Sequence, residues 1–349
     1  WRKYHEKQEI RQTDAQVYAR RLRKLAHDVL ETHARNTLLD NAFRDPSNPI
    51  ALPVEAATPD IHAVFCIDVR SERLRRIIEC EDPGVRTSGF AGFFGFPIEV
   101  LTIDGADADA QCPVLLEPQF RVRESARTAE AASTLLQRTR EQRQLGAAWR
   151  TFNRAAVSSF AYVESLGIAY AAKLASDLVR GAFGLKKKRH FAPSIQTLDS
   201  CGEATDLQLQ QQVDLAESVL RGMSMTEQFA PLVALVGHGS TAVNNPYASR
   251  YHCGACGGHA GDANARLAAA ILNNRDVRTK LQARGIEVPE TTAFVAALHA
   301  TATDEVTLLD TGLLPESSRA HVTKLQTLFD KAAMTVRLTR ARDHGVMND

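Results

Sequence analysis

The stretch that decides the fold is Pro231-Leu232-Val233-Ala234-Leu235-Val236, followed at once by Gly237-His238-Gly239. This short, continuously apolar run is typical of a strand buried on both faces of a parallel sheet. Glycine on each side of His238 lets the backbone turn sharply there. In open α/β sheets, ligands bind beyond the carboxyl ends of the strands. We therefore expect His238 to lie at the functional edge of a buried strand.

A second stretch, far upstream, follows the same pattern. Residues 61–69 predict a buried strand that ends in Phe65-Cys66-Ile67-Asp68-Val69-Arg70, and residues 71–78 predict a helix with Ser71 as its N-cap. Residues two apart on a strand face the same side, so Cys66, Asp68 and Arg70 project together if the strand continues that far. Strands that alternate with helices predict an α/β fold with a mainly parallel sheet flanked by helices.

The two stretches divide the chain into four parts. We expect an N-terminal helical segment over residues 1–58, a first half of an α/β core over 59–120, a helical insertion or cap over 121–229 and a second half of the core over 230–349. Helical patterns cover 121–150, 155–183, 206–229, 262–281 and 315–342, and strands are predicted at 292–299 and 305–309.

Composition excludes several classes of function. With Lys+Arg 42 and Asp+Glu 41, the chain has no net field to attract nucleic acid. The glycine-rich residues 254–261 lack the Lys-Ser/Thr of a P-loop, which argues against nucleotide binding. No apolar run approaches the roughly 18–20 residues of a membrane span, and no signal peptide is visible. Six cysteines scattered over 349 residues indicate reduced thiols rather than a disulfide framework.

Two thiols and an imidazole offer a candidate metal site. Thiolate, imidazole and carboxylate are the ligands that zinc takes in proteins, and Cys66, His238 and Cys253 are the first three candidates. Asp68 is the natural fourth ligand. It could bind the metal and close the site, or it could pair with Arg70 and leave the fourth position open to water, whose pKa then falls to about 7. That choice would act as an on–off switch.

Each residue also has an ordinary structural interpretation. A cysteine in a buried strand is more often a small core residue than a ligand, and this applies to Cys66. Asp68 and Arg70 could form a structural ion pair, and His238 could cap the loop that follows it. We predict a metal site because all of these residue types occur together at predicted strand ends and in glycine loops.

The downstream cysteine pair leaves alternatives open. Cys253 and Cys256 could form half of a zinc knuckle, but the sequence has no second Cys-x-x-Cys to complete it. Either could be the ligand, with Cys253 favoured, and His252 and His259 are candidates to orient the ligands by hydrogen bonds. The same pair could instead form a reversible disulfide in a thiol redox protein.

Three other features allow competing interpretations. The aromatic-glycine loop over residues 89–96 could line a channel for a small neutral gas, but a packed corner is favoured. The basic residues 186–190 are expected on a solvated surface, with an anionic membrane face as the alternative. His299, near a predicted strand end, is expected in the core.

Three motifs are long enough to compare with known families. They are Cys66-Ile-Asp68-Val-Arg70-Ser-Glu72-Arg73, Gly89-Phe-Ala-Gly-Phe-Phe-Gly95, and His238-Gly-Ser-x₃-Asn244-Asn-Pro246-Tyr247 with Cys253-Gly-Ala-Cys256-Gly-Gly-His259-x-Gly-x-x-Asn264-x-Arg266. These motifs resemble the DabA family, the large subunit of the DabA–DabB inorganic-carbon transporter. The set Cys66-x-Asp68-x-Arg70 with a later His and Cys resembles the β-carbonic anhydrases. They cluster in residues 60–100 and 230–270.

The resemblance implies a β-carbonic-anhydrase-like core with a helical insertion. It implies a zinc ion on Cys66, Asp68, His238 and Cys253, with Arg70 as partner of Asp68. It also implies a peripheral protein on the cytoplasmic face of the inner membrane, bound to DabB, a multi-spanning protein related to cation antiporters. The pair would hydrate CO2 to bicarbonate in one direction, driven by a cation gradient, and the CO2 hydration would require the membrane partner.

The chain departs from both patterns. It has about half the length of the family's chains, and Cys253 follows His238 by fifteen residues, whereas β-carbonic anhydrases place the second cysteine three residues after the histidine. The intervening loop must therefore fold back. The alternative function is a structural zinc scaffold that docks on a membrane cation-transporting partner, because structural zinc sites are closed by four protein ligands.

Overall fold

The computed structural model describes residues 58–126, 128–154, 171–172, 175–176, 194–198, 208–240 and 247–345. All of them belong to the unit Thr58–Asp349. The predicted N-terminal helical segment, the basic residues 186–190 and the motif residues Asn244 to Pro246 lie outside the described residues. So do the apolar helices predicted over 155–183, apart from two short helical pieces.

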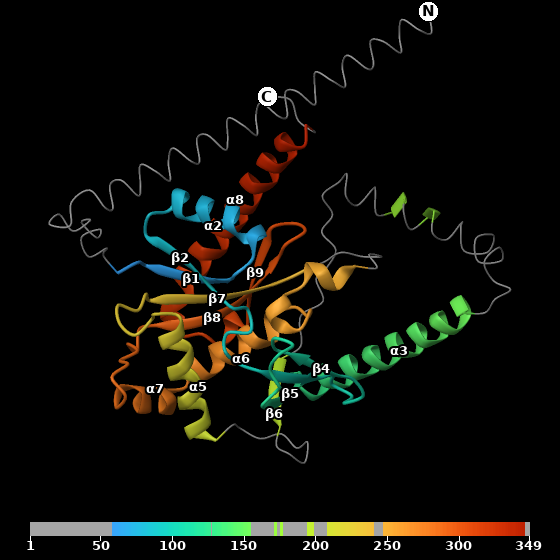
Figure 1. The fold of residues 1–349 in the computed structure, drawn as a ribbon, viewed down its shortest axis with the longest axis horizontal. Coiled ribbons are helices and arrows are strands. Elements are labelled where there is room, and N and C mark those ends of the chain that lie inside the picture. Colours follow the sequence, from blue (N-terminus) through green and yellow to red (C-terminus); the bar gives the residue numbers. More distant parts are fainter. Residues whose placement is uncertain are drawn as a thin grey trace, which may run out of the picture. The chain divides into compact units, whose positions relative to one another are not determined.

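A five-stranded sheet in the order β2-β1-β7-β8-β9 forms the centre of the fold (Figure 1). Its first four strands run parallel and β9 runs antiparallel to β8. This confirms the predicted α/β class with a mainly parallel sheet. The strands are β1 (Ile61–Cys66), β2 (Val85–Phe90), β7 (Leu232–Gly239), β8 (Ala293–Ala300) and β9 (Glu305–Leu309).

Helices cover both faces of this sheet, which is why β1 and β7 are apolar without alternation. In Figure 1, α2 (Val69–Glu81) and α8 (Arg319–Asp343) lie above it and α5 (Leu209–Gly222), α6 (Asp262–Asn273) and α7 (Arg275–Gln282) lie below it. Neighbouring side chains of one strand belong to different apolar clusters: Val64 packs in the cluster of α5 to α7, and Phe65 packs in the cluster of α2 and α8.

Several predicted elements differ from the structure. The helix predicted over 262–281 is two helices, because Asn274 ends α6 and its side chain accepts a hydrogen bond from the Asp276 N–H (3.0 Å) to cap α7. The helix predicted over 206–229 is the shorter α5, and the closing helix α8 begins at Arg319 after a 3₁₀ turn, Glu316–Ser318. The strands predicted at 292–299 and 305–309 are confirmed as β8 and β9.

A second, four-stranded sheet in the order β4-β3-β5-β6 was not predicted. The helix predicted from residue 121 was wrong at its start: residues 120–125 form β5, in which Val122 is buried between the less buried Arg121 and Arg123, a period of two rather than 3.6. The helix α3 begins at Ala129 and ends at Arg154. The strands are β3 (Ile98–Leu101), β4 (Ala108–Gln111), β5 (Phe120–Ser125) and β6 (Ser194–Leu198).

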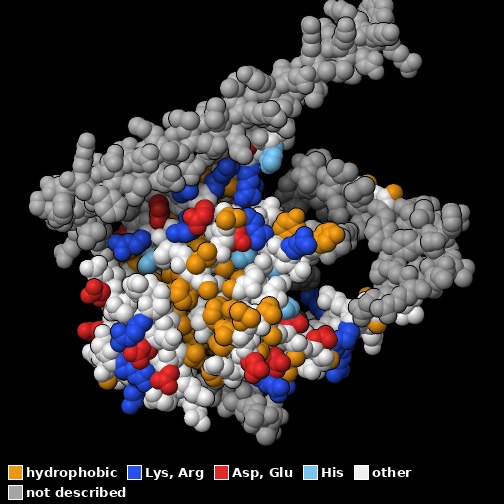
Figure 2. All heavy atoms as spheres, in the orientation of Figure 1, with side chains coloured by type: hydrophobic (Ala, Val, Ile, Leu, Met, Phe, Trp, Pro, Cys, Tyr) orange, Lys and Arg blue, Asp and Glu red, His pale blue; other side chains and the backbone are white. Residues whose placement is uncertain are grey.

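Charged side chains of both signs lie on the described surface. Figure 2 shows Lys and Arg side chains interspersed with Asp and Glu around hydrophobic side chains on the face that it draws. This mixture agrees with the balanced composition and gives that face no field of one sign. In the part of the chain that the structure describes, no helix combines the length and the apolar character that a bilayer crossing requires.

Candidate metal centre

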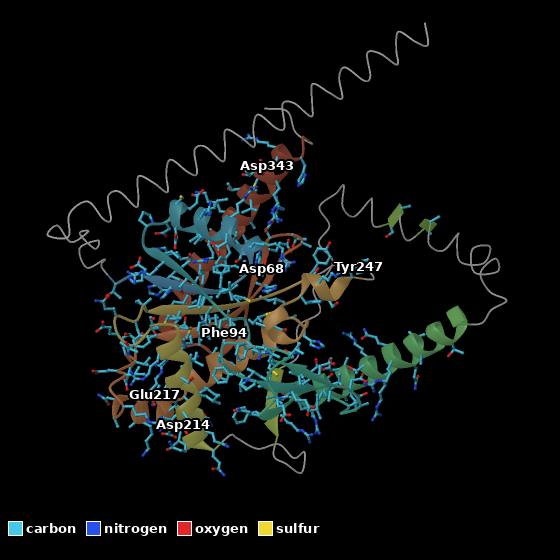
Figure 3. All side chains as sticks on the ribbon, in the orientation of Figure 1. Asp68, Phe94, Asp214, Glu217, Tyr247 and Asp343 are labelled. Atoms are coloured by element: carbon cyan, nitrogen blue, oxygen red, sulfur yellow. The ribbon has the colours of Figure 1, made fainter. Side chains whose placement is uncertain are left out.

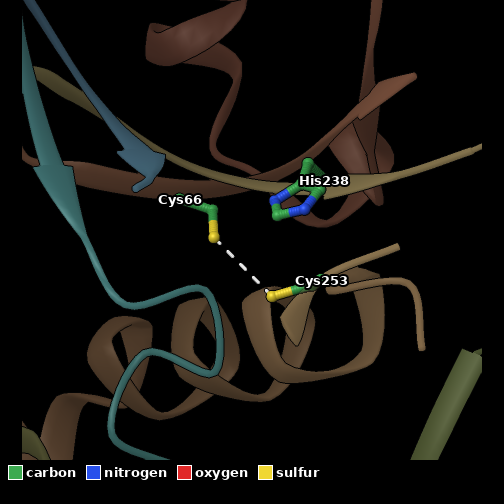
Figure 4. Close-up of side chains that lie close together, drawn as sticks. All are labelled: Cys66, His238 and Cys253. Atoms are coloured by element: carbon green, nitrogen blue, oxygen red, sulfur yellow. Dashed lines mark hydrogen bonds between the residues drawn. The ribbon is translucent and has the colours of Figure 1, made fainter. Parts of the chain in front are cut away.

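Three predicted ligands meet at the carboxyl ends of β1 and β7. These strands are parallel neighbours, with Phe65 opposite Val236, so their ends lie at the same edge of the sheet. Cys66 ends β1, His238 is the penultimate residue of β7, and Cys253 approaches from the following segment (Figure 4). Their ligand atoms all lie within 4.8 Å of one another and all three residues are buried. This group could hold a metal ion.

The segment from Cys253 to His259 folds into a closed turn that fixes the Cys253 thiol. The Cys253 N–H donates to the His259 carbonyl (3.0 Å), and the Gly258 N–H donates to the Cys253 carbonyl (2.9 Å). Gly257 has a φ of 66° and a Cβ there would lie 2.5 Å from the Ala110 carbonyl oxygen of β4. The turn therefore requires glycine both for its backbone conformation and for its packing on the second sheet.

A close backbone crossing brings this turn to His238. The Gly261 N–H donates to the His238 carbonyl (3.0 Å). A Cβ on Gly237 would lie 2.4 Å from the Gly261 carbonyl oxygen, so Gly237 permits the two backbones to touch. This crossing shows how a cysteine fifteen residues after His238 returns to its side.

The donor geometry fits a tetrahedral metal ion. The Sγ atoms of Cys66 and Cys253 lie 3.6 Å apart, and two thiolates bound to one zinc ion at their usual distance stand about 3.8 Å apart. Within the described part of the chain, neither ring nitrogen of His238 has a hydrogen-bond partner, although both are buried. A buried imidazole without hydrogen bonds is costly, and a bound metal ion would satisfy one nitrogen.

Gly92 completes the wall beside the two thiols. A Cβ at this position would lie 2.4 Å from Cys66 Sγ and 2.7 Å from Cys253 Sγ. Glycine therefore lets the backbone of the 91–97 loop lie directly against the thiol pair. The favoured interpretation of this loop as a packed corner is confirmed for Phe94 and Phe96, which are fully buried. Sequence reasoning found the loop but missed the contact of Gly92 with the thiols.

Asp68 and Arg70 pair as expected, but a helix cap rather than a strand brings them together. β1 ends at Cys66, so the predicted strand through residue 69 was too long, and α2 begins at Val69. Asp68 is the N-cap and accepts from the Arg70 N–H (2.8 Å). Ser71 was wrongly predicted as the cap; it lies in the first turn, where its Oγ donates to the Asp68 carbonyl (2.7 Å).

The Asp68 carboxylate is bound on both oxygens by Arg70. Arg70 Nε donates to Oδ1 and Nη2 donates to Oδ2, each at 2.7 Å. Burial raises the pKa of Asp68, but the hydrogen bonds from Arg70 outweigh it and the pKa is lowered to about 2. Oδ2 also lies 3.4 Å from His238 Nε2, which places the carboxylate next to the candidate ligands. Figure 3 shows Asp68 and Tyr247 toward the end of the sheet where β7 ends.

The three buried cysteines at this site, Cys66, Cys253 and Cys256, have different proton affinities. Hydrogen bonds with Cys256 and then Cys66 lower the pKa of Cys253 to about 3. The hydrogen bond to Cys253 and burial raise the pKa of Cys66, and the same two causes raise the pKa of Cys256. The hydrogen bonds among the three thiols therefore favour the thiolate form at Cys253 over the other two. Cys256 lies outside the group of three and acts as a hydrogen-bonding neighbour of Cys253.

The remaining histidines of the sequence analysis contact other groups. His252 Nδ1 accepts from the Ser240 N–H (3.3 Å), and His259 Nδ1 lies 3.9 Å from an Asp109 oxygen. His299 is in the core as expected, where its ring meets Phe65 edge to face at 6.4 Å between centroids. Neither Thr301 nor Tyr251 was predicted to approach the site, yet both contact Arg70. No pattern in the sequence marks them.

Comparison with known proteins gives the family of the chain. The family model described as "Probable inorganic carbon transporter subunit DabA" matches residues 1–348. Probable inorganic carbon transporter subunit DabA 2 of Bradyrhizobium sp. strain BTAi1 is 45% identical over 331 residues, which cover 91% of this chain and 39% of that protein. The corresponding protein of Chloroflexus aurantiacus is 43% identical over 88% of this chain and 39% of its own length. That of Roseiflexus sp. strain RS-1 is 40% identical over 91% of this chain and 40% of its own length.

The chain thus spans about two fifths of the length of these relatives. No solved structure matches it. The family model extends over almost the whole chain, and the identities hold over most of it. The chain therefore belongs to the DabA family of probable inorganic carbon transporter subunits.

Proposed function

We propose that this chain carries the zinc centre of an inorganic-carbon transporter subunit, and that this centre hydrates CO2 to bicarbonate in one direction. The observation that carries the proposal is the buried group of Cys66, His238 and Cys253 beside a carboxylate that an arginine holds. Membership of a transporter-subunit family supports inorganic carbon as the substrate class.

Zinc is the metal that the donor set favours. Two thiolates and one imidazole suit a tetrahedral zinc ion, and hard cations prefer oxygen ligands. Cys66, His238 and Cys253 would hold the ion, with Asp68 as fourth ligand in a closed form. A zinc ion held by these residues would lower the pKa of a bound water to about 7 and would so supply a nucleophile for CO2 at neutral pH.

Asp68 and Arg70 would decide whether the fourth position is available. The pKa of Asp68 keeps it ionised at neutral pH, so it is an acceptor with two possible partners, Arg70 or the metal. Held on both oxygens by Arg70, it leaves the fourth position open. Released by Arg70, it starts 3.4 Å from the His238 ring, within reach of the site. Both residues are thus the proposed catalytic pair.

The wider assembly is part of the proposal. The relatives are named as transporter subunits, which implies further subunits. We propose a DabB-like multi-spanning membrane partner that couples hydration to a cation gradient, peripheral attachment at the cytoplasmic face of the inner membrane, and hydration only when the partner is bound. Neither nucleotide nor nucleic acid has a role in this scheme.

The organisation of the chain belongs to the same proposal. We propose a β-carbonic-anhydrase-like core whose halves, 59–120 and 230–349, flank an insertion over 121–229, after an N-terminal segment over 1–58. The larger sheet takes its strands from residues 61–90 and 232–309, which supports two halves. Because β6 and nearly all of β5 fall within 121–229, the insertion is not helical throughout.

A structural zinc scaffold that docks on a membrane cation transporter is the second candidate. Its support is the burial of the three ligands and the position of Asp68, 3.4 Å from the His238 ring, as a potential fourth ligand. A closed site of this kind would stabilise the fold without chemistry.

One substitution separates the two candidates. In cells that make the full chain with its membrane partner, Asp68→Ala should abolish uptake of labelled inorganic carbon while the purified protein keeps its zinc. Asp343→Ala is the matched control, because it removes an Asp–Arg pair on the exposed surface, Arg73–Asp343 (Figure 3). Full uptake by the Asp68→Ala protein contradicts the catalytic proposal and favours the scaffold.

A further inference from the structure

We propose that Thr301 is a positioning residue: it holds Arg70 in the orientation that captures Asp68, and thereby sets the balance between the open and closed forms of the metal centre. This inference rests on the function proposed above. Thr301 lies at the carboxyl end of β8. It supplies no candidate ligand, and it is not part of β1 or β7, the strands that carry Cys66 and His238.

The donors of Arg70 divide into two sets. Nε and Nη2 bind the two oxygens of Asp68 at 2.7 Å each. Nη1 points to a different part of the protein, where it donates to Thr301 Oγ1 (3.2 Å) and to the Tyr251 carbonyl (3.3 Å). A guanidinium is planar and rigid, so fixing Nη1 also fixes the edge that faces Asp68.

Thr301 is itself fixed by the segments that carry the candidate ligands. It directly follows β8, and only 3% of its surface is exposed. Its N–H donates to the Gly239 carbonyl (3.0 Å), one residue after His238, and its Oγ lies 3.2 Å from the same oxygen. Oγ also lies 3.3 Å from the Tyr251 carbonyl, two residues before Cys253. The hydroxyl therefore ties Arg70 to the ends of both ligand-bearing segments.

Of the two acceptors that bind Arg70 Nη1, only the Thr301 hydroxyl can be removed by substituting a side chain. The Tyr251 contact uses a main-chain carbonyl, and the Tyr251 ring lies 5.9 Å from the guanidinium carbon. Thr301→Val replaces the accepting oxygen with a methyl group of similar size. The guanidinium then loses one acceptor, and we expect the open-to-closed ratio to fall about tenfold, as for loss of a hydrogen bond to a charged group.

The test measures how readily the fourth position accepts an anion. The full chain is loaded with cobalt in place of zinc, and azide is titrated while the visible absorption of the cobalt is recorded. Azide binds only when Asp68 leaves the position free, so its apparent Kd rises as the open form becomes rarer. Thr301→Val should raise this Kd, and Thr301→Ser, which keeps the hydroxyl, should restore the unsubstituted value.

Thr292→Val is the matched control. Thr292 directly precedes the first residue of β8 and, like Thr301, is 3% exposed. Its Oγ donates a hydrogen bond to the Ala230 carbonyl (3.1 Å). Thr292→Val removes an equivalent buried hydroxyl, so it should lower the melting temperature of the protein as much as Thr301→Val does. It should leave the azide affinity of the cobalt protein unchanged. Thr301→Ala serves as a second variant if Thr301→Val does not fold.

A double substitution tests whether Thr301 affects azide binding by way of Asp68. In an Asp68→Ala background the fourth position has no competing carboxylate, so Thr301→Val should leave azide affinity unchanged. An equal effect of Thr301→Val with and without Asp68 would overturn the inference, as would unchanged affinity in the single variants. If the unsubstituted protein binds no cobalt, the proposed function fails instead. Cobalt that binds but never responds to azide would overturn the inference, because Arg70 would then not hold Asp68 away from the fourth position.

Discussion

At the scale of single residues, Gly92 lies so close to the two candidate thiols that no side chain fits there. The Cβ of an alanine there would overlap both thiols, at 2.4 Å from Cys66 Sγ and 2.7 Å from Cys253 Sγ. Gly92→Ala must therefore push the sulfurs apart or displace the loop. We predict a fall of about 10–100-fold in zinc affinity, measured by competition with a chelator, the range seen when groups around metal ligands are replaced.

Gly254→Ala is the control for that prediction. Gly254 follows Cys253 directly, yet a Cβ there meets nothing within 4 Å, so the substitution tests alanine without the clash. Zinc affinity should stay at the unsubstituted value. Equal affinity of the Gly92→Ala and Gly254→Ala proteins would show that the thiols do not form the site.

Asp68 combines two roles that substitutions can separate. It caps α2 through the Arg70 N–H and pairs with the Arg70 side chain. Asp68→Ala removes both and should lower the free energy of unfolding by about 1–3 kcal/mol. Asp68→Asn keeps a capping oxygen and should lose less, while both variants lose carbon uptake. Urea unfolding checks the stabilities, and uptake retained by the Asn variant would mean that the charge is not needed.

The sequence predicted that candidate ligands lie at strand ends, but it predicted less well which contacts surround them. Cys66 and His238 follow from two apolar strands with polar ends, and parallel neighbours bring such ends together. The grouping of Asp68 with Arg70 rested on strand alternation, whereas the structure uses a helix cap. Thr301, Tyr251 and Gly92 could not be predicted, because their contacts span segments that only the fold brings together.

At the scale of elements, Asn264 joins α6 to the second sheet and to the 91–97 loop. It is fully buried, and its Nδ2 donates to the Phe96 carbonyl (2.7 Å) and to the Gln111 carbonyl of β4 (2.9 Å). Asn264→Ala leaves both carbonyls buried without this donor. We predict a loss of about 2–4 kcal/mol in the free energy of unfolding, measured with urea.

Asn264→Asp distinguishes hydrogen bonding from packing in that prediction. It has almost the same volume but offers oxygens where the two carbonyls need a donor. The Asp variant should be at least as destabilised as the Ala variant. A stable Asp variant would mean that shape alone joins these elements.

Strand prediction succeeded best where apolar residues follow one another without interruption. β7 and β8 are largely apolar runs of ordinary strand length, and both were found; the shorter β9, in which Val306 is buried, was found as well. β2, β3 and β4 were missed because they are short or only partly buried, so they lack a period of two strong enough to detect. β5 was hidden because Arg121 and Arg123 extend the charged pattern of α3 backward.

At the scale of the whole molecule, metal binding should be coupled to folding. The proposed ligands come from β1, from β7 and from the 253–259 turn, so only the folded chain assembles them. A ligand that binds only the folded state adds about 2.7 kcal/mol at a concentration of a hundred times its Kd. We predict that chelation lowers the melting temperature, that added zinc restores it, and that Cys66→Ser responds to neither treatment.

The most direct test of the central claim is zinc content by elemental mass spectrometry on the purified full chain and four variants. We predict one zinc per chain in the unsubstituted protein and in Cys256→Ser, whose thiol lies outside the group of three. Cys66→Ser, His238→Ala and Cys253→Ser should each lose it while circular dichroism shows a retained fold. Absence of zinc from the folded unsubstituted protein, or zinc retained by those three variants, would contradict the account.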